Sequence, residues 1–292
     1  MAENNKFFDD LGDDEGAMGF EVQMGSNNEG DEESTYRTQN DPSRPYQRSN
    51  VVERKGSVEI RCAAVDVIHG SLEPGGDPAT LLVYDFRFDP RKRARRIVEA
   101  HMSFTYASVN SAVAAGPAVL KIAPTGRMTL VPSRQQETTI RSGNANAGGG
   151  ALGLTLGASV KWEKTVSHET SDATTVVGSV DLVSRNFGES NSASWSLIEN
   201  KSVETGVPAF VRTAVLLRRA DNKTKFRAAF KIHARADLWS SLERVFGKTP
   251  KDDPILYDPS LPATNRLRKY DVDNLGSIDL SDLSSVAFTN ND

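Results

Sequence analysis

Hydrophobic and polar residues alternate with a period of two from Val58 onward, a pattern that puts successive side chains on opposite faces of a β-strand. The pattern is clearest between Val98 and Tyr106, where apolar residues occupy every second position. About ten strands are predicted, over residues 58–69, 81–88, 98–106, 119–123, 128–131, 152–162, 174–183, 193–199, 210–218 and 225–234.

Short turn sequences such as Pro124-Thr125-Gly126 separate these strands, and no long helical pattern lies between them. The sequence therefore predicts a mainly all-β fold, an antiparallel β-sandwich. One helix is predicted at 237–246, where Asp237 is a suitable N-cap and Gly247 a suitable stop. We expect it to close one end of the sandwich.

The two ends of the chain differ from this central part. Residues 1–55 are rich in Asp, Glu, Asn, Gly and Ser. Such a segment buries too little apolar surface to offset its ordering entropy, so we predict a disordered acidic tail. The sandwich domain with its closing helix is predicted at 56–248. Residues 249–292 are rich in Pro and Asp, and we expect an irregular extension that packs on the domain.

Charge and cysteine content narrow the classes of function. The formal net charge is -4, so no global positive field attracts nucleic acid or anionic membranes. The sequence shows neither the pattern of a signal peptide nor a run of about 18 apolar residues, so we expect neither secretion by the standard route nor a transmembrane helix. Cys62 is the only cysteine, which excludes an intramolecular disulfide and a cysteine-based zinc site. We expect a cytoplasmic protein, with the nucleus as the alternative.

No pattern typical of catalysis stands out. The four histidines are spread singly along the chain, and none has a second histidine or a carboxylate at the spacing of metal ligands. They are His69, His101, His168 and His233. The glycine-rich segment 143–157 lacks the Gly-Lys-Ser/Thr of a phosphate-binding loop and opens a strand. No Gly-x-Ser-x-Gly is present. We therefore expect no enzymatic activity and no cofactor.

One dense basic cluster follows Asp89-Pro90. Its members are Arg91, Lys92, Arg93, Arg95 and Arg96. Basic runs of this length are typical of nuclear-import signals or nucleic-acid contacts. No aromatic platform or second basic stripe accompanies the cluster, which favours a solvated turn. Nucleic acid is therefore not an expected partner.

An aspartate-rich segment near the C-terminus partly resembles an EF-hand calcium loop. Oxygen ligands would fall at Asp271, Asp273, Asp279 and Asp282. Leu275, however, occupies a position where a carboxylate or amide is expected, and an aspartate at the last position is too short to replace the usual bidentate glutamate. These features count against calcium binding.

The segment 152–183 allows a second interpretation. Apolar residues at alternate positions from Leu152 to Trp162 form one face, with Gly, Thr, Ser and Lys on the other. Paired with 174–183 after a turn at 167–172, this segment would match a membrane-inserting β-hairpin. A sandwich hairpin whose apolar face packs on the core requires the same alternation and is the favoured interpretation.

Five stretches of the sequence resemble a family of β-rich intracellular proteins of filamentous fungi. They are FRFD at 86–89, ETSDATTV at 169–176, RNFG at 185–188, ASWSLIEN at 193–200 and DPILYDP at 253–259. The resemblance covers about 58–288. It implies a fungal origin and an intracellular β-rich domain, and it assigns no site residues.

Three hypotheses of function follow. The leading one is a non-catalytic binding or scaffold protein that recognises a protein or a polar ligand, because strand patterns are abundant and catalytic patterns are missing. The second is a conditional β-hairpin pore former, without constitutive membrane association. The third is a self-assembling capsid-like or filament protein that pairs its sheet edges. Expected partners are another protein or further copies of the chain.

Overall fold

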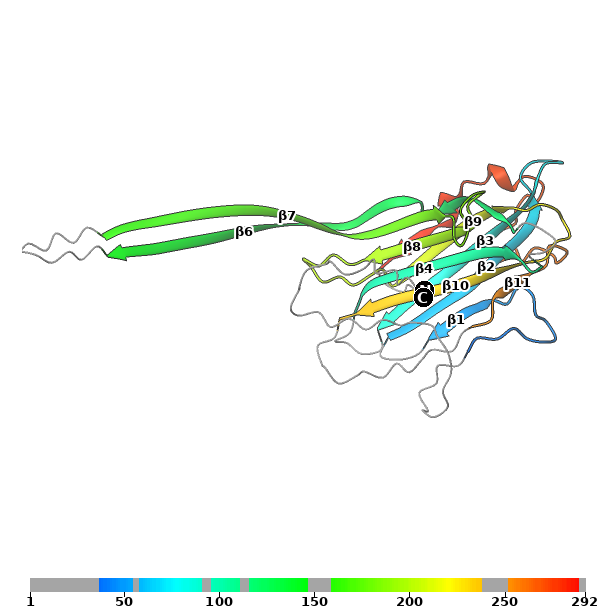
Figure 1. Ribbon diagram of the computed structural model, residues 1–292, viewed down its shortest axis with the longest axis horizontal. Coiled ribbons are helices and arrows are strands. Elements are labelled where there is room, and N and C mark those ends of the chain that lie inside the picture. The colour runs from blue at the N-terminus through cyan, green and yellow to red at the C-terminus, as the bar shows by residue number, and fades with distance from the viewer. Residues whose placement is uncertain are drawn as a thin grey trace, which may run out of the picture.

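A computed structural model describes residues 37–54, 58–90, 96–110, 116–146, 159–237 and 252–288, which form two antiparallel sheets (Figure 1). The predicted antiparallel sandwich is confirmed. The strands are β1 Asn50–Arg54, β2 Val58–Ser71, β3 Pro78–Pro90, β4 Ile97–Ser108, β5 Ala118–Ala123, β6 Gly126–Asn146, β7 Ser159–Asp181, β8 Ser192–Ile198, β9 Phe210–Arg218, β10 Phe226–Ala236, β11 Ile255–Tyr257 and β12 Ser285–Ala287.

Each sheet has six strands. In the first sheet the order is β1-β2-β3-β9, and β12 and β5 pair with successive parts of the free edge of β9. In the second sheet the order is β11-β10-β4-β8-β7-β6. Antiparallel neighbours joined by short connections, such as β2 and β3, agree with the turn signals in the sequence.

Aromatic residues fill the space between the two sheets. The ring of Tyr84 on β3 stacks on Phe104 of β4 with centroids 4.2 Å apart, and Phe230 of β10 lies 4.7 Å from Phe104. Tyr84 and Phe104 are fully buried. This core fixes the face-to-face packing of the two sheets.

The N-terminal part of the chain requires a correction. Residues 1–55 were expected to be disordered, but β1 lies inside that segment and pairs with β2. Its Val51 and Val52 are buried in the core. Arg54 also forms an ion pair with Asp252. Two adjacent valines and partners distant in the chain therefore order this strand, although the composition of residues 1–55 is mainly polar.

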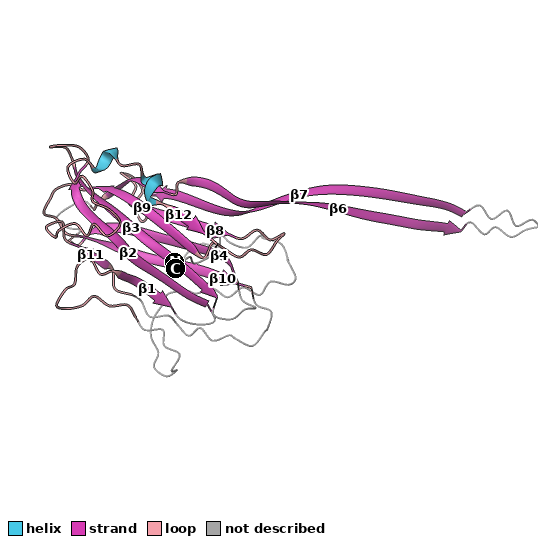
Figure 2. Cartoon of the chain, turned by 180° about the vertical axis from the view of Figure 1, so that it is seen from behind, coloured by secondary structure: helices cyan, strands magenta, loops and turns pink. Residues whose placement is uncertain are grey.

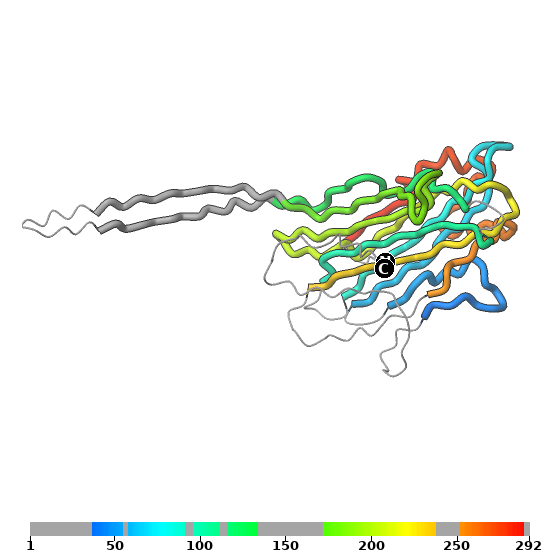
Figure 3. Tube along the Cα trace, in the orientation of Figure 1, coloured from blue at the N-terminus to red at the C-terminus, as the bar shows by residue number. Residues whose placement is uncertain are grey.

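The C-terminal segment covers the outer face of the first sheet, and Figure 3 traces it in orange and red. Leu275, Leu280 and Leu283, in the 3-10 helices Leu275–Ser277 and Leu280–Leu283, pack there against the sheet. Asp66 of β2 is buried beneath the segment and accepts hydrogen bonds from the Arg266 N–H at 2.6 Å and the Tyr270 hydroxyl at 2.8 Å, with Thr264 and Leu267 as further donors.

The predicted helix at 237–246 lies outside the described residues except for Asp237. Among the described residues, no helix combines the length and the apolar character needed to cross a bilayer.

Candidate functional site

The second sheet ends in a long hairpin made of β6 and β7, which projects from the sandwich (Figures 1 and 2). The ladder runs from Gly126–Gly178 at the base to Asn146–Ser159 at the outer end. The next strand, β8, pairs with β7 only from Thr175 to Asp181. The ladder between Ser133 and Asn146 therefore has two strands only, over a length of roughly 40 Å at about 3.3 Å per residue.

The register assigns residues of the outer hairpin to two faces, because residues opposite each other in an antiparallel ladder share a face. Ala145 pairs with Val160 and Gly143 with Trp162. The other face holds the rungs of Asn146 with Ser159 and of Asn144 with Lys161. The outer end of the ladder is thus apolar on one face and polar on the other.

The sequence between the two strands continues this alternation, although its structure lies outside the described residues. The even-numbered positions from 152 to 158 are Leu, Leu, Leu and Ala, and the odd-numbered positions are Gly, Thr and Gly.

This hairpin differs from the one predicted. Residues 152–162 and 174–183 were expected to pair with each other through a turn at 167–172. Instead, residues 159–181 form the single strand β7, in which His168 pairs with Glu137 of β6. The expected turn contains neither Gly nor Pro, so nothing in it forces a reversal. The part of the expected strand at 152–158 lies outside the described residues.

A β-bulge marks the base of the outer hairpin. The register shifts between Leu130 and Ser133, and Val131 adopts a positive φ of 46°. Such a bulge bends and twists its strand. It separates the part of β6 that belongs to the sandwich from the part that projects.

The side chain of Asn200 holds this bulge in place. Its Nδ2 donates to the carbonyl oxygen of Val131 at 2.8 Å and to the Ser133 hydroxyl at 2.9 Å. The Asp172 carbonyl oxygen on β7 also accepts from Nδ2, at 3.3 Å. Asn200 is fully buried, so one amide joins both strands of the hairpin to the loop after β8. No feature of the sequence indicated this role.

Two further contacts fix the base. Burial opposes ionisation of Asp172, but hydrogen bonds from the Ser202 and Ala173 N–H groups keep the pKa of its carboxyl below the usual value. Trp195 of β8 is buried and donates from Nε1 to the Pro124 carbonyl oxygen at 2.9 Å, directly before β6. The hairpin thus projects from a firmly bonded base.

Of the basic cluster, Arg91, Lys92, Arg93 and Arg95 lie outside the described residues. Arg96 is described, and its guanidinium forms ion pairs with Glu199 at 2.9 Å and Asp237 at 2.5 Å. Burial opposes the charge, but these carboxylates raise the pKa of Arg96. Arg96 therefore bonds to carboxylates of its own chain.

The four aspartates considered for calcium are all in the described part of the chain. Asp279 accepts a hydrogen bond from the Ser281 N–H at 2.9 Å and caps a 3-10 helix, and Asp271 accepts from the Asp273 N–H at 3.2 Å. The described residues contain no group of three or more His, Cys, Asp or Glu that could hold a metal ion, so Asp271, Asp273, Asp279 and Asp282 do not converge.

His69 and His101 take part in hydrogen bonds within the sandwich. His69 Nδ1 lies 2.9 Å from the Thr80 hydroxyl and Nε2 lies 2.7 Å from Gln47 Nε2. Burial, with a smaller contribution from Arg219, lowers the pKa of His69 to about 4, against the opposing effect of Asp258. His101 pairs with His233 in the ladder and lies 2.9 Å from the Ser196 hydroxyl.

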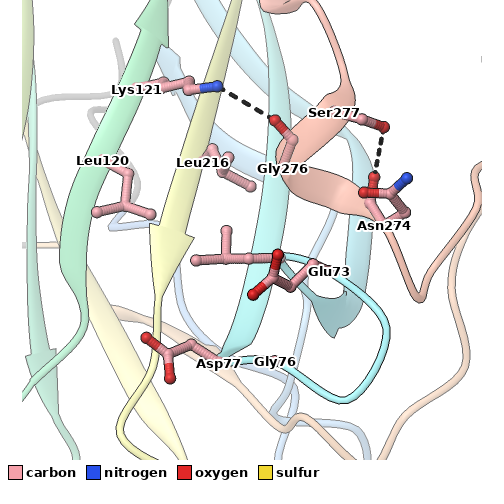
Figure 4. Close-up of a pocket in the computed structure, with 10 residues that line it drawn as sticks. Glu73, Gly76, Asp77, Leu120, Lys121, Leu216, Asn274, Gly276 and Ser277 are labelled. Carbon is pink, nitrogen blue, oxygen red and sulfur yellow. Dashed lines mark hydrogen bonds between the residues drawn. The ribbon is translucent and has the colours of Figure 1, made fainter.

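An open groove of about 600 Å³ lies beside the turn between β2 and β3 (Figure 4). Its polar residues include Glu73, Asp77 and Lys121, whose Nζ donates to the Gly276 carbonyl oxygen at 3.1 Å. Gly276 packs closely against Leu72, and a Cβ atom at this position would lie 2.6 Å from the Leu72 carbonyl oxygen. The groove combines charges of both signs with the apolar side chains of Leu120 and Leu216.

No family model and no curated protein matches the chain. Among solved structures, the chain is similar to the membrane-inserted form of the NetB toxin of Clostridium perfringens, at 9% sequence identity and a TM-score of 0.25, over 65% of this chain and 88% of the toxin chain.

Proposed function

We propose that this protein is a conditional pore former that perforates lipid bilayers by inserting its β6–β7 hairpin. One observation carries the proposal: beyond its base the hairpin is a two-stranded ladder, and its outer end has one apolar and one polar face. A strand that faces lipid on one side and water on the other requires this alternation. The activity needs no catalytic residue, so we propose a non-enzymatic role.

The apolar alternation in the sequence that leads into β7 has the length of a membrane span. A transmembrane strand takes about 9–11 residues when it is tilted by about 45°. The alternation from Leu152 to Trp162 covers about 11 residues. Trp162 ends it, in keeping with the aromatic residues that mark the membrane interface in transmembrane strands. The more polar ladder between Trp162 and the bulge would then lie in water.

The hairpin also needs further strands, which we propose come from other copies of the chain. Along the described outer ladder, each strand has one neighbour only. In hydrocarbon the unpaired N–H and C=O groups of such edges would be prohibitively unfavourable. Hairpins from several copies that pair edge to edge in a closed ring satisfy these groups. Self-assembly and pore formation thus become one function.

The test uses two neighbouring residues that the register places on opposite faces. Val160→Arg puts a charge on the face proposed to meet lipid, which costs on the order of 2 kcal/mol per copy and multiplies around the ring. We expect it to reduce dye release from vesicles at least tenfold. Ser159→Arg, its matched control, puts the same charge on the water-facing side and should retain release.

Circular dichroism and thermal unfolding establish that both variants keep the sandwich. Equal loss of release in both variants would contradict the assignment of faces. Wild-type protein that associates with no vesicle and releases no dye, between pH 4.5 and 7.5 and with neutral or anionic lipid, would overturn the proposed function.

The groove in Figure 4 favours a second candidate function, recognition of a small polar ligand by the sandwich. Its volume falls in the range of ligand sites, and Lys121 offers a positive charge to an anionic group. In a thermal-shift screen, a binding anion should raise the melting temperature of the wild type and have less effect on Lys121→Gln. Lys231→Gln, an exposed change on β10, is the control. A screen without any shift argues against this role.

A further inference from the structure

We propose that the rung of Arg141 and Lys164 in the outer hairpin binds the headgroups of anionic phospholipids. This inference rests on the proposed membrane insertion and names the lipid that favours it. It follows from the register of the hairpin and from the order of residue types along one face.

The rung pairs two basic residues. Arg141 and Lys164 are direct partners in the β6–β7 ladder and therefore share a face. Like charges directly opposite each other destabilise a strand pair. On the same face, the adjacent rungs are Gly143 with Trp162 and Thr139 with Val166. None of these residues is ionisable, so neither adjacent rung supplies a carboxylate to offset the two charges.

The position of the rung relative to Trp162 indicates what would offset them. Counting from the outer end, the face runs from Ala145 and Val160 through Gly143 and Trp162 to Arg141 and Lys164. It is therefore apolar, then aromatic, then basic. Aromatic residues mark the interface of a membrane, and long basic side chains next to them reach the level of the phosphates.

The charge next to the membrane is also positive when both faces are counted. The rungs on the other face directly beside this one pair Ile140 with Thr165 and Ser142 with Glu163. These add one acidic residue against the two basic ones, so the formal charge of the three rungs remains +1. A negative surface potential attracts such residues, and each is worth roughly a fivefold gain in membrane affinity. The chain as a whole has a net charge of -4, so the attraction must be local.

The experiment compares vesicles of phosphatidylcholine with vesicles that contain 30% phosphatidylserine. On anionic vesicles, the double variant R141Q/K164Q should need roughly thirtyfold more protein than the wild type for half-maximal dye release. On neutral vesicles the two proteins should be equal. The matched control R227Q/K231Q removes two exposed basic residues of β10 and should behave as the wild type.

Two further arms separate the sources of failure. Inorganic phosphate at constant ionic strength should not compete, and competition would assign the site to free phosphate and overturn the lipid assignment. Equal activity of R141Q/K164Q and wild type on anionic vesicles would overturn the inference while the pore remains. Wild-type protein without release or flotation on either vesicle would instead overturn the proposed function. Thermal unfolding of the variants confirms that the sandwich is intact.

Discussion

The sandwich and the outer hairpin are both built from antiparallel strands, but their strands differ in the neighbours they pack against. In the sandwich, each strand has neighbours on both sides or lies over the core, and residues such as Phe104 are fully buried. In the outer hairpin, Gly143 and Trp162 belong to a ladder with no third strand. An isolated two-stranded ladder is marginally stable in water. The stability of the protein therefore resides in the sandwich, and the hairpin sequence fits a different environment.

The largest effect on stability is expected in the aromatic core. Phe104→Ala removes a buried ring in contact with Tyr84 and Phe230, so the free energy of unfolding should fall by about 3–5 kcal/mol. Urea unfolding followed by tryptophan fluorescence measures it. Leu120→Ala, at a partly exposed position of β5, is the control and should cost much less. A similar cost for both would mean that the two sheets are not held together by this cluster.

Acid should weaken the sandwich through His69. Burial lowers the pKa of His69 in the folded protein to about 4. Once the pH falls below about 6.5, His69 therefore binds a proton in the unfolded chain but not in the folded protein. The stabilising contribution is complete above pH 6.5 and decreases as the pH falls toward about 4, by at most about 3 kcal/mol.

Urea unfolding at pH 7.5, 5.5 and 4.5 tests this dependence. In His69→Gln the loss of stability on acidification should be smaller than in the wild type, and the value at pH 7.5 gives the cost of the substitution itself. An identical pH dependence in both proteins would show that other groups control acid stability.

At the base of the hairpin, the effect should be smaller and local. Asn200→Asp replaces the Nδ2 donor by an oxygen that faces the carbonyl oxygens of Val131 and Asp172. We expect a loss of about 1–2 kcal/mol and faster hydrogen exchange at the bulge. Asn222→Asp, in the exposed loop before β10, is the control. Unchanged exchange at Ser133 would show that the amide does not hold the hairpin.

The sandwich could be predicted from the sequence because burial imposes a period of two on its strands. The strand at 210–218 was predicted with the bounds that β9 has. The shorter strands β1, β11 and β12 were missed, since three to five residues carry too little of the pattern. Partners distant in the chain determine them, as when Ile255 pairs with Ala228.

The hairpin was predictable only in part, because only one of its two strands shows a period of two. The alternation up to Trp162 identified one face of β7 but not its partner strand. Residues 134–146 contain Ile140 as their one large apolar residue, so no period appears in them, and the pairing is visible only in the register. The Asn200 contacts join residues far apart in sequence, and no local pattern reports such a bond.

The smallest effect on stability should come from Trp162→Ala, although tryptophan is the largest residue type. The outer ladder at Trp162 has no third strand, so the substitution should change the free energy of unfolding of the protein by less than about 0.5 kcal/mol. Removing an interfacial aromatic should still raise the protein concentration needed for vesicle release. Trp195→Ala, in the buried core, provides the contrast, because it should lower stability by about 3–5 kcal/mol. If Trp162→Ala unfolded the protein as readily as Trp195→Ala, the hairpin would be part of the folded core, and membrane insertion would require breaking that core first.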